Sequence, residues 1–213
     1  MVFISHVCWS QNDIDSGRVV RVLTFNILHG ATMKGDYDLE VIDRVIRESD
    51  ADLVALQEVD FMTMRARGYD LVTELGWRVK MAPLFARAMD YDGGEYGEGI
   101  LSRYSYASTR NVPLPYSEGR EPRTALEVIT ILPFGDTIVF IGTHLDHLGD
   151  ETDRVRQVKR INEVFLQNKH PVILAGDLNA VPGSVSIGIL EEVPPANIVP
   201  ISYTGYEGSG TST

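Results

Sequence analysis

The chain has 213 residues, 44% hydrophobic and 23% charged, which is long enough for one sizeable domain and ordinary for a globular protein. The formal net charge of −11 counts against a large surface that tracks duplex nucleic acid, because such surfaces carry an excess of Lys and Arg. A phosphoester in a local cleft is not excluded, since a bound cation dominates the field at short range. The single cysteine, Cys8, excludes an internal disulfide and a cysteine-based zinc site.

The first 17 residues precede the first clear strand pattern. Met1–Gln11 mixes apolar and polar residues, and two interpretations stay open: the end of a secretory signal, or an N-terminal arm. The first interpretation favours a secreted or periplasmic protein, and the second is equally compatible with the cytoplasm. Residues 18–213 are expected to form one domain, because they contain no internal repeat, no low-complexity linker and no bilayer-spanning apolar run.

Short β-rich runs alternate with helical stretches, which predicts an α/β fold. In chain order, the first half is expected to contain a strand, an amphipathic helix, a buried strand, a short helix closed by Gly76, and another strand: Arg18–Asn26, Asp36–Ser49, Leu53–Leu56, Tyr69–Leu75 and Trp77–Ala82. The stretch Ala88–Gly99 is rich in Gly, Asp and Tyr and is expected to be a mobile surface loop.

The second half is expected to be strand-rich before it becomes helical. Four strands are predicted at Ile100–Ser102, Thr109–Val112, Thr124–Ile131 and Thr137–Thr143, the last two joined as a hairpin. A long amphipathic helix, a buried strand and a short helix then follow at Asp150–Asn168, Pro171–Ala175 and Ser184–Leu190. From Glu191 onward the chain is rich in Pro, Gly, Ser and Thr.

Polar residues collect where the buried strands end, at Asn26, Glu58, His144, Asp177 and Asn179. Each one alone is typical of a turn or a helix cap. Together, following four separate apolar strands, they favour a site presented by a rigid scaffold. Their oxygen donors suit Mg²⁺, which takes one or two carboxylates, waters and substrate phosphate oxygens. A zinc site would need more imidazole or thiolate groups at closer spacing.

Six segments appear in an order that resembles the endonuclease/exonuclease/phosphatase family: FNILHG, LQEVD, GEGILSRY, REPRTAL, GTHLDH and AGDLNA. The resemblance covers roughly residues 20–183. It implies two packed mixed β-sheets flanked by helices, a four-layer α/β/β/α sandwich. It also implies a metal-dependent hydrolase of phosphoester bonds that uses in-line attack of water, with Mg²⁺, or alternatively Mn²⁺, as the cofactor.

The resemblance also assigns roles to residues. Glu58 matches the family's main metal-ligand carboxylate, Asn26 matches the Asn beside the metal, and Asp177 completes the expected metal set. Asp177 also matches the aspartate that positions or deprotonates the attacking water. His144 and Asn179 match the groups that contact the phosphate and steady its developing charge.

Other positions around these segments have less certain roles. Arg123 is expected to clamp the phosphate through its planar fork, with Arg120 as its competitor. Gln157 is expected to support the site from the long helix. Asp146 is expected to orient a neighbour, and His147 to lie on the surface.

Two departures from the family pattern stand out. Glu98 occupies a position where the family usually has Asn, and its carboxylate would either add negative charge near the substrate or face solvent. The family's final aspartate strand and Ser-Asp-His segment have no counterpart after Asn179. The expectation is therefore a domain that lacks its last strands, with little turnover of its own.

Three functions compete: a phosphoester hydrolase, a phosphoester-binding domain without turnover, and a structural domain, which the clustered segments disfavour. The substrate class stays open among small-molecule, lipid and nucleic-acid phosphoesters. The acidic composition favours a small or lipid phosphoester over long duplex DNA. The stretches Ala88–Gly99 and Pro113–Arg120 are expected to select the substrate.

Overall fold

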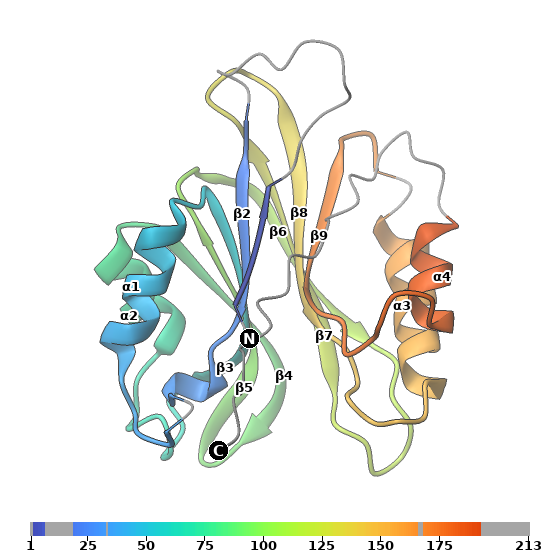
Figure 1. Cartoon of the computed structure of the whole chain (residues 1–213), viewed down its shortest axis with the longest axis horizontal. Coiled ribbons are helices and arrows are strands. Elements are labelled where there is room, and N and C mark those ends of the chain that lie inside the picture. The colour runs from blue at the N-terminus through green and yellow to red at the C-terminus, as the bar shows by residue number, and fades with distance from the viewer. Residues whose placement is uncertain (1, 7–18, 33, 166–167, 193–213) are drawn as a thin grey trace, which may run out of the picture.

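The computed structural model describes residues 2–6, 19–32, 34–165 and 168–192. Two β-sheets pack face to face, and helices cover the outer face of each (Figure 1). The four-layer α/β/β/α sandwich predicted from the sequence is confirmed. No helix among the described residues is both long and apolar enough to cross a bilayer.

The first sheet has the strand order β1-β2-β3-β5-β4 and is built from the first half of the chain. Its strands are β1 (Val2–His6), β2 (Arg21–Asn26), β3 (Leu53–Phe61), β4 (Ala82–Tyr91) and β5 (Gly94–Ser102). β2 and β3 run parallel, and the other pairs are antiparallel. The helices α1 (Leu39–Ser49) and α2 (Leu71–Val79) cover this sheet, and a short 3₁₀ turn, η1 (Leu28–Gly30), follows β2.

The second sheet has the order β6-β7-β8-β9 and is built from the second half of the chain. Its strands are β6 (Tyr106–Leu114), β7 (Arg123–Ile131), β8 (Thr137–His144) and β9 (Val172–Asp177). Only β8 and β9 run parallel. The helices α3 (Thr152–Phe165) and α4 (Val185–Glu191) lie on its outer side. The two sheets are thus contiguous in sequence, and the chain passes from one to the other through residues 103–105.

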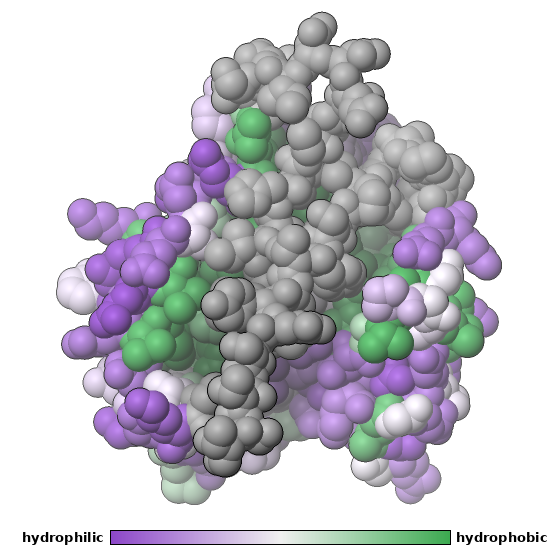
Figure 2. Space-filling model, viewed as in Figure 1, coloured by the Kyte–Doolittle hydropathy of each residue, from purple (hydrophilic) through white to green (hydrophobic). Residues whose placement is uncertain are grey.

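Three apolar clusters correspond to the three interfaces between the four layers. The helix-facing cluster of the first sheet contains Leu56 and Ile42, the cluster between the sheets contains Ile100 and Phe140, and the α3-facing cluster contains Ile161. Because successive side chains of a strand point to opposite faces, central strands such as β3 are buried on both sides. Hydrophilic side chains cover much of the outer surface of both helical layers (Figure 2).

The strand predicted at Trp77–Ala82 is wrong, because α2 continues through Gly76 to Val79. The sequence interpretation treats Gly76 as a helix terminator, but the helix ends at Lys80, which adopts the left-handed conformation with φ 59°. Gly76 instead allows close packing: a Cβ there would lie 2.8 Å from the carbonyl oxygen of Met81.

The mobile loop predicted at Ala88–Gly99 is also wrong. β4 and β5 form a long antiparallel hairpin across this stretch. Asp92 and Gly93 turn the chain with φ values of 47° and 80°, as expected for a type I′ hairpin turn. The dipeptide Asp-Gly is the sequence signal for this turn.

The remaining differences lie at the ends of elements and of the chain. The strand Val2–His6, which pairs antiparallel with β2, is not anticipated by the sequence interpretation. The rest of the expected N-terminal arm or signal, residues 1 and 7–18, lies outside the described residues, as does the segment 193–213 in which the family's final strand is expected to be missing.

The close approach at Gly76 generates a stability prediction. Gly76→Ala normally favours a helix by ~1 kcal/mol. Here the added methyl group would also meet the Pro83 Cβ at 3.0 Å. We expect the free energy of unfolding to fall by about 1–3 kcal/mol, the usual cost of overpacking, in urea denaturation.

The matched control is Gly188→Ala in α4, where the new methyl group would meet no heavy atom of the described residues within 4 Å. This variant should be neutral or slightly stabilising. Equal effects of the two substitutions would contradict the packing role of Gly76.

Candidate active site

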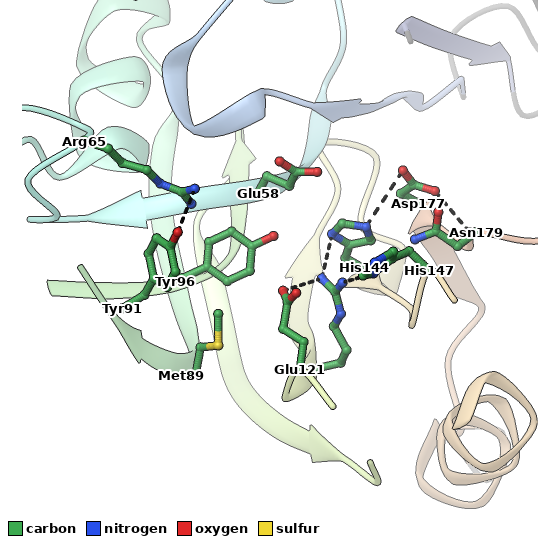
Figure 3. Close-up of a pocket in the computed structure, with 11 residues that line it drawn as sticks. Glu58, Arg65, Met89, Tyr91, Tyr96, Glu121, His144, His147, Asp177 and Asn179 are labelled. Carbon is green, nitrogen blue, oxygen red and sulfur yellow. Dashed lines mark hydrogen bonds and ion pairs between the residues drawn. The ribbon is translucent and has the colours of Figure 1, made fainter. Parts of the chain in front are cut away.

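The carboxyl ends of the two parallel strand pairs meet at one end of the sandwich and surround a cavity of about 390 Å³. Its lining is largely polar and comes from both sheets: Glu58, Arg65, Met89, Tyr91, Tyr96, Glu121, Arg123, His144, His147, Asp177 and Asn179. The structure therefore brings five of the candidate residues to one cavity: Glu58, His144, Asp177, Asn179 and Arg123. Figure 3 shows the first four among the lining side chains.

Glu58 reaches the cavity because β3 is irregular at this point. The β3–β5 register shifts between Leu56 and Val59, so β3 carries a bulge, and Glu58 adopts φ 56°. A bulge re-aims side chains and is common beside functional sites. The Glu58 carboxylate is held on one side by Asn26, whose side-chain amide donates to Oε1 at 2.8 Å. Asn26 itself does not line the cavity.

His29 is a neighbour of Glu58 that sequence reasoning assigned no role, although it lies within the segment FNILHG. Its Nδ1 lies 3.8 Å from Glu58 Oε2. Burial, with a further contribution from the positive charge of Arg65, lowers the pKa of His29 below its ordinary value. The imidazole is therefore neutral at pH 7, and the contact is not an ion pair.

On the second sheet, His144 and Asp177 are register partners at the ends of β8 and β9. Their facing atoms, His144 Nε2 and Asp177 Oδ2, are 3.9 Å apart. Asn179 adopts φ 47°, and its backbone N–H donates to Asp177 Oδ1 at 3.1 Å. Its side-chain amide donates to the carbonyl of Leu145 at 2.9 Å, which fixes its orientation at the cavity edge.

Arg123 determines the tautomer of His144. Its Nη1 lies 3.0 Å from His144 Nδ1, and an arginine can only donate, so Nδ1 must accept. Burial, together with the charge of Arg123, lowers the pKa of His144 to about 3. His144 is thus neutral at pH 7, with its single proton on Nε2, the nitrogen that faces Asp177. Glu121 also lies 3.2 Å from Arg123 Nη1.

The less certain sequence candidates take distinct places. Arg120 does not line the cavity; its Nη2 lies 3.6 Å from the Asp150 carboxylate. Gln157 is fully buried, accepts from the backbone N–H of Asp146 and donates to the carbonyl of Pro115, so it ties the loop after β8 to the loop after β6.

Two further residues in that loop have defined places. His147 is exposed, but it also lines the cavity, with its Nδ1 3.5 Å from Arg123 Nη2. Asp146 is buried and accepts from the backbone N–H of Leu148 at 3.1 Å, so its carboxylate orders its own loop.

Glu98 does not face solvent, so that half of its sequence interpretation is wrong. Its residue is 1% exposed, and its strand position, two residues before Ile100, directs it between the two sheets. Neither carboxylate oxygen has a hydrogen-bond partner among the described residues. Burial raises the pKa of Glu98 well above its ordinary value, although the charge of Arg123 acts in the opposite direction.

The donor set fits a hydrated hard cation. Among the described residues, no three His, Cys, Asp or Glu side chains are grouped closely enough to cage a metal ion. Mg²⁺ does not need such a cage, because it keeps several waters and uses one or two carboxylates together with substrate phosphate oxygens. Glu58, oriented by Asn26 at the edge of a polar cavity, supplies this kind of ligand.

Comparison with known proteins identifies the family and supports the fold. Residues 23–210 match the model of the endonuclease/exonuclease/phosphatase family. The chain belongs to this family. Its fold is similar to that of a family member from Beutenbergia cavernae, with 25% identity and a TM-score of 0.62 over 78% of this chain. This chain spans 50% of the length of the Beutenbergia protein.

Two more distant structures share the fold. A family protein from Bacteroides thetaiotaomicron is 18% identical with a TM-score of 0.65, over 80% of this chain and 67% of that one. The human Nocturnin catalytic domain, solved with a bound sulfate anion, is 20% identical with a TM-score of 0.61, over 81% of this chain and 68% of that one.

The low pKa of His144 predicts a pH effect on stability. The unfolded state binds a proton near pH 6.5 and the folded state only near pH 3, so this contribution is complete above pH 6.5 and is lost as the pH falls toward 3. As the pH falls through this range, the free energy of unfolding decreases by up to about 1.4 kcal/mol for each pH unit. Urea titrations from pH 7.5 to 4.5 should show a steeper decline for the wild type than for His144→Gln.

His170→Gln, which removes a histidine that does not line the cavity, serves as the control and should retain the wild-type slope. Parallel slopes for the wild type and His144→Gln would contradict the buried neutral imidazole.

The raised pKa of Glu98 predicts the opposite dependence of stability on pH. Because its folded pKa lies above its unfolded value, the stability it contributes is complete below about pH 4.5 and is lost as the pH rises through the folded pKa. We expect Glu98→Gln to raise the free energy of unfolding at pH 8 by up to about 1.4 kcal/mol for each pH unit by which burial raises the Glu98 pKa, because the neutral amide does not titrate. The gain should vanish near pH 4.5.

Glu95→Gln, on the same strand with its side chain 36% exposed, is the matched control and should change stability little. A loss of stability in Glu98→Gln at pH 8 would show that the carboxylate has a stabilising partner.

Proposed function

We propose that the function of this site is the hydrolysis of phosphoesters with Mg²⁺, by in-line attack of water on phosphorus. The observation that supports this proposal is the single cavity that joins Glu58 from the first sheet to His144, Asp177 and Asn179 from the second. The cavity volume of about 390 Å³ lies within the range of small-molecule sites.

The second sheet provides the donors for the phosphate. His144 is a neutral imidazole whose Nε2–H is directed toward the cavity, because Arg123 occupies the other ring nitrogen. The amide of Asn179 and the guanidinium of Arg123 line the same wall. Donors fixed in advance of the reaction stabilise the charge that develops on the equatorial oxygens.

The proton of the attacking water would pass to Asp177. His144 cannot accept it at neutral pH through Nδ1, which already accepts from Arg123, or through Nε2, which carries the proton. The Asp177 side chain is 35% exposed in the cavity, and the backbone N–H of Asn179 orients one of its oxygens. These contacts support Asp177 as the general base.

Glu58, oriented by the side-chain amide of Asn26, would hold the cation on the first sheet, opposite these groups. When bound, Mg²⁺ polarises a phosphoryl oxygen and neutralises charge on the leaving group. The cation would also reduce electrostatic repulsion. The chain has a negative net charge, and an anionic ester would enter a cavity lined by the carboxylates of Glu58, Glu121 and Asp177.

The decisive experiment measures nitrophenol release from 4-nitrophenyl phosphate and its bis-ester. Mg²⁺ should be required, EDTA should abolish release, and His144→Ala should lower kcat by about 10²–10³-fold, as for other transition-state donors. His170→Ala, which alters a histidine that does not line the cavity, should leave kcat unchanged.

Binding of a non-hydrolysable phosphonate is measured by calorimetry alongside turnover. Mg²⁺-dependent binding without nitrophenol release would identify a phosphoester-binding domain that lacks turnover. Release that persists in EDTA would contradict the metal-dependent mechanism.

A further inference from the structure

The wall of the cavity that faces the phosphate-binding groups is built from residues that the proposed hydrolysis does not use. Arg65 follows β3, while Met89, Tyr91 and Tyr96 belong to the β4–β5 hairpin. In Figure 3 they lie across the cavity from His144, and the Tyr96 hydroxyl points into the space between the two sides. A group attached to a phosphate at His144 would meet this wall.

Arg65 is held rigidly in the wall. Its Nε and Nη2 donate to the two oxygens of Asp60 at 2.7 and 2.8 Å, and Asp60 is fully buried. The guanidinium carbon also lies 4.4 Å from the ring centre of Tyr91 and 5.6 Å from that of Tyr96. The remaining nitrogen, Nη1, lies 3.5 Å from the Tyr91 hydroxyl. The donor is therefore fixed in place before any ligand binds.

This wall does not suit a second phosphate. Asp60 balances the charge of Arg65, and Glu58 and Glu121 add negative charge to the same cavity. Phosphate oxygens only accept hydrogen bonds, as carboxylates do, so they would be repelled here. A hydroxyl group both donates and accepts. It matches a cavity that offers a guanidinium donor, two phenol groups and a Glu121 acceptor.

The wall also does not form the parallel stack that a nucleobase prefers. Arg65 covers one face of Tyr91. The rings of Tyr91 and Tyr96 are tilted by 53° with centres 6.0 Å apart. Base recognition by stacking uses an open aromatic face. Two tilted phenols with polar tips and a fixed guanidinium instead fit a puckered ring that carries hydroxyl groups on its edge.

We propose that Arg65, Tyr91 and Tyr96 form a hydroxyl-recognition wall, which binds the hydroxylated ring of a sugar or cyclitol phosphate. This inference rests on the hydrolase function proposed above. The ring lies against this wall while its phosphate lies against His144 and Asn179. The ribose of a nucleotide shares this chemistry, so the experiment includes both sources of the ring.

The test compares the wild type with the double variant Tyr91→Phe/Tyr96→Phe, which keeps both rings and removes both hydroxyls. The substrates are glucose 1-phosphate, myo-inositol 1-phosphate, a ribonucleoside 5′-monophosphate and 4-nitrophenyl phosphate, which has no ring hydroxyl. We expect kcat/KM of the double variant to fall about 10–100-fold for the hydroxylated-ring ester that the wild type prefers, because two hydrogen bonds are lost. The nitrophenyl ester should change less than about 3-fold.

Two controls separate recognition from folding. Tyr69→Phe removes the hydroxyl of a comparably exposed tyrosine, 44% exposed against 39% for Tyr91, that does not line the cavity, and it should behave as the wild type. Arg65→Lys keeps a charge beside Asp60 but loses the fork, and it should weaken the same substrates by raising KM more than it lowers kcat. Thermal melts confirm that each variant is folded.

The outcomes distinguish the two proposals. If the wild type hydrolyses the nitrophenyl ester but shows no preference for a hydroxylated ring, or if all esters change together in the double variant, the wall is overturned and the hydrolase function stands. If no ester is hydrolysed, the hydrolase function is contradicted. Calorimetric binding of myo-inositol 1-phosphate and glucose 1-phosphate with Mg²⁺ then tests whether the wall recognises the ring. Binding lost only in the double variant supports the wall; equal or absent binding overturns it.

Discussion

The face-to-face packing of the two sheets is the constraint on which the site depends. A layer of fully buried aliphatic and aromatic side chains, among them Ile100 and Phe140, holds the sheets together. Burial of each such side chain contributes roughly 1.5–3 kcal/mol to the free energy of unfolding. Because each sheet contains one parallel strand pair whose carboxyl ends lie at the same end of the sandwich, this packing places Glu58 opposite His144. Neither sheet alone contains a complete set of groups for phosphoester chemistry.

The sequence predicts the parts of this arrangement that depend on local pattern. Apolar periodicity locates α1 and α3 to within a few residues, and polar residues after apolar strands identify the cavity groups Glu58, His144 and Asp177. It fails where tertiary packing determines the outcome. Gly76 resembles a helix terminator in sequence, but its lack of a side chain serves close packing against Met81.

The missed part of the site has a similar cause. Arg65 and Tyr91 are 26 residues apart and meet only because the β4–β5 hairpin folds beside the loop after β3. The segment that carries Tyr91 has the composition of a loop, so sequence reasoning placed specificity there without its geometry. The contact between Arg123 and His144, which fixes the tautomer, likewise joins residues far apart in the chain, because the start of β7 lies beside the end of β8. Such contacts have no periodicity by which they could be recognised.

The segregation of the two sheets along the chain has a consequence for how the cavity forms. The strands and helices from β1 to β5 and those from β6 to α4 each build one sheet with its own covering helices, and among the described residues the segment 103–105 joins them. Contacts within each half can therefore form before the halves associate, whereas the cavity exists only after they dock. The distance across the cavity then reports on the docking of the two halves. A substitution in the shared apolar layer that shifts one sheet against the other would therefore change the width of the cavity.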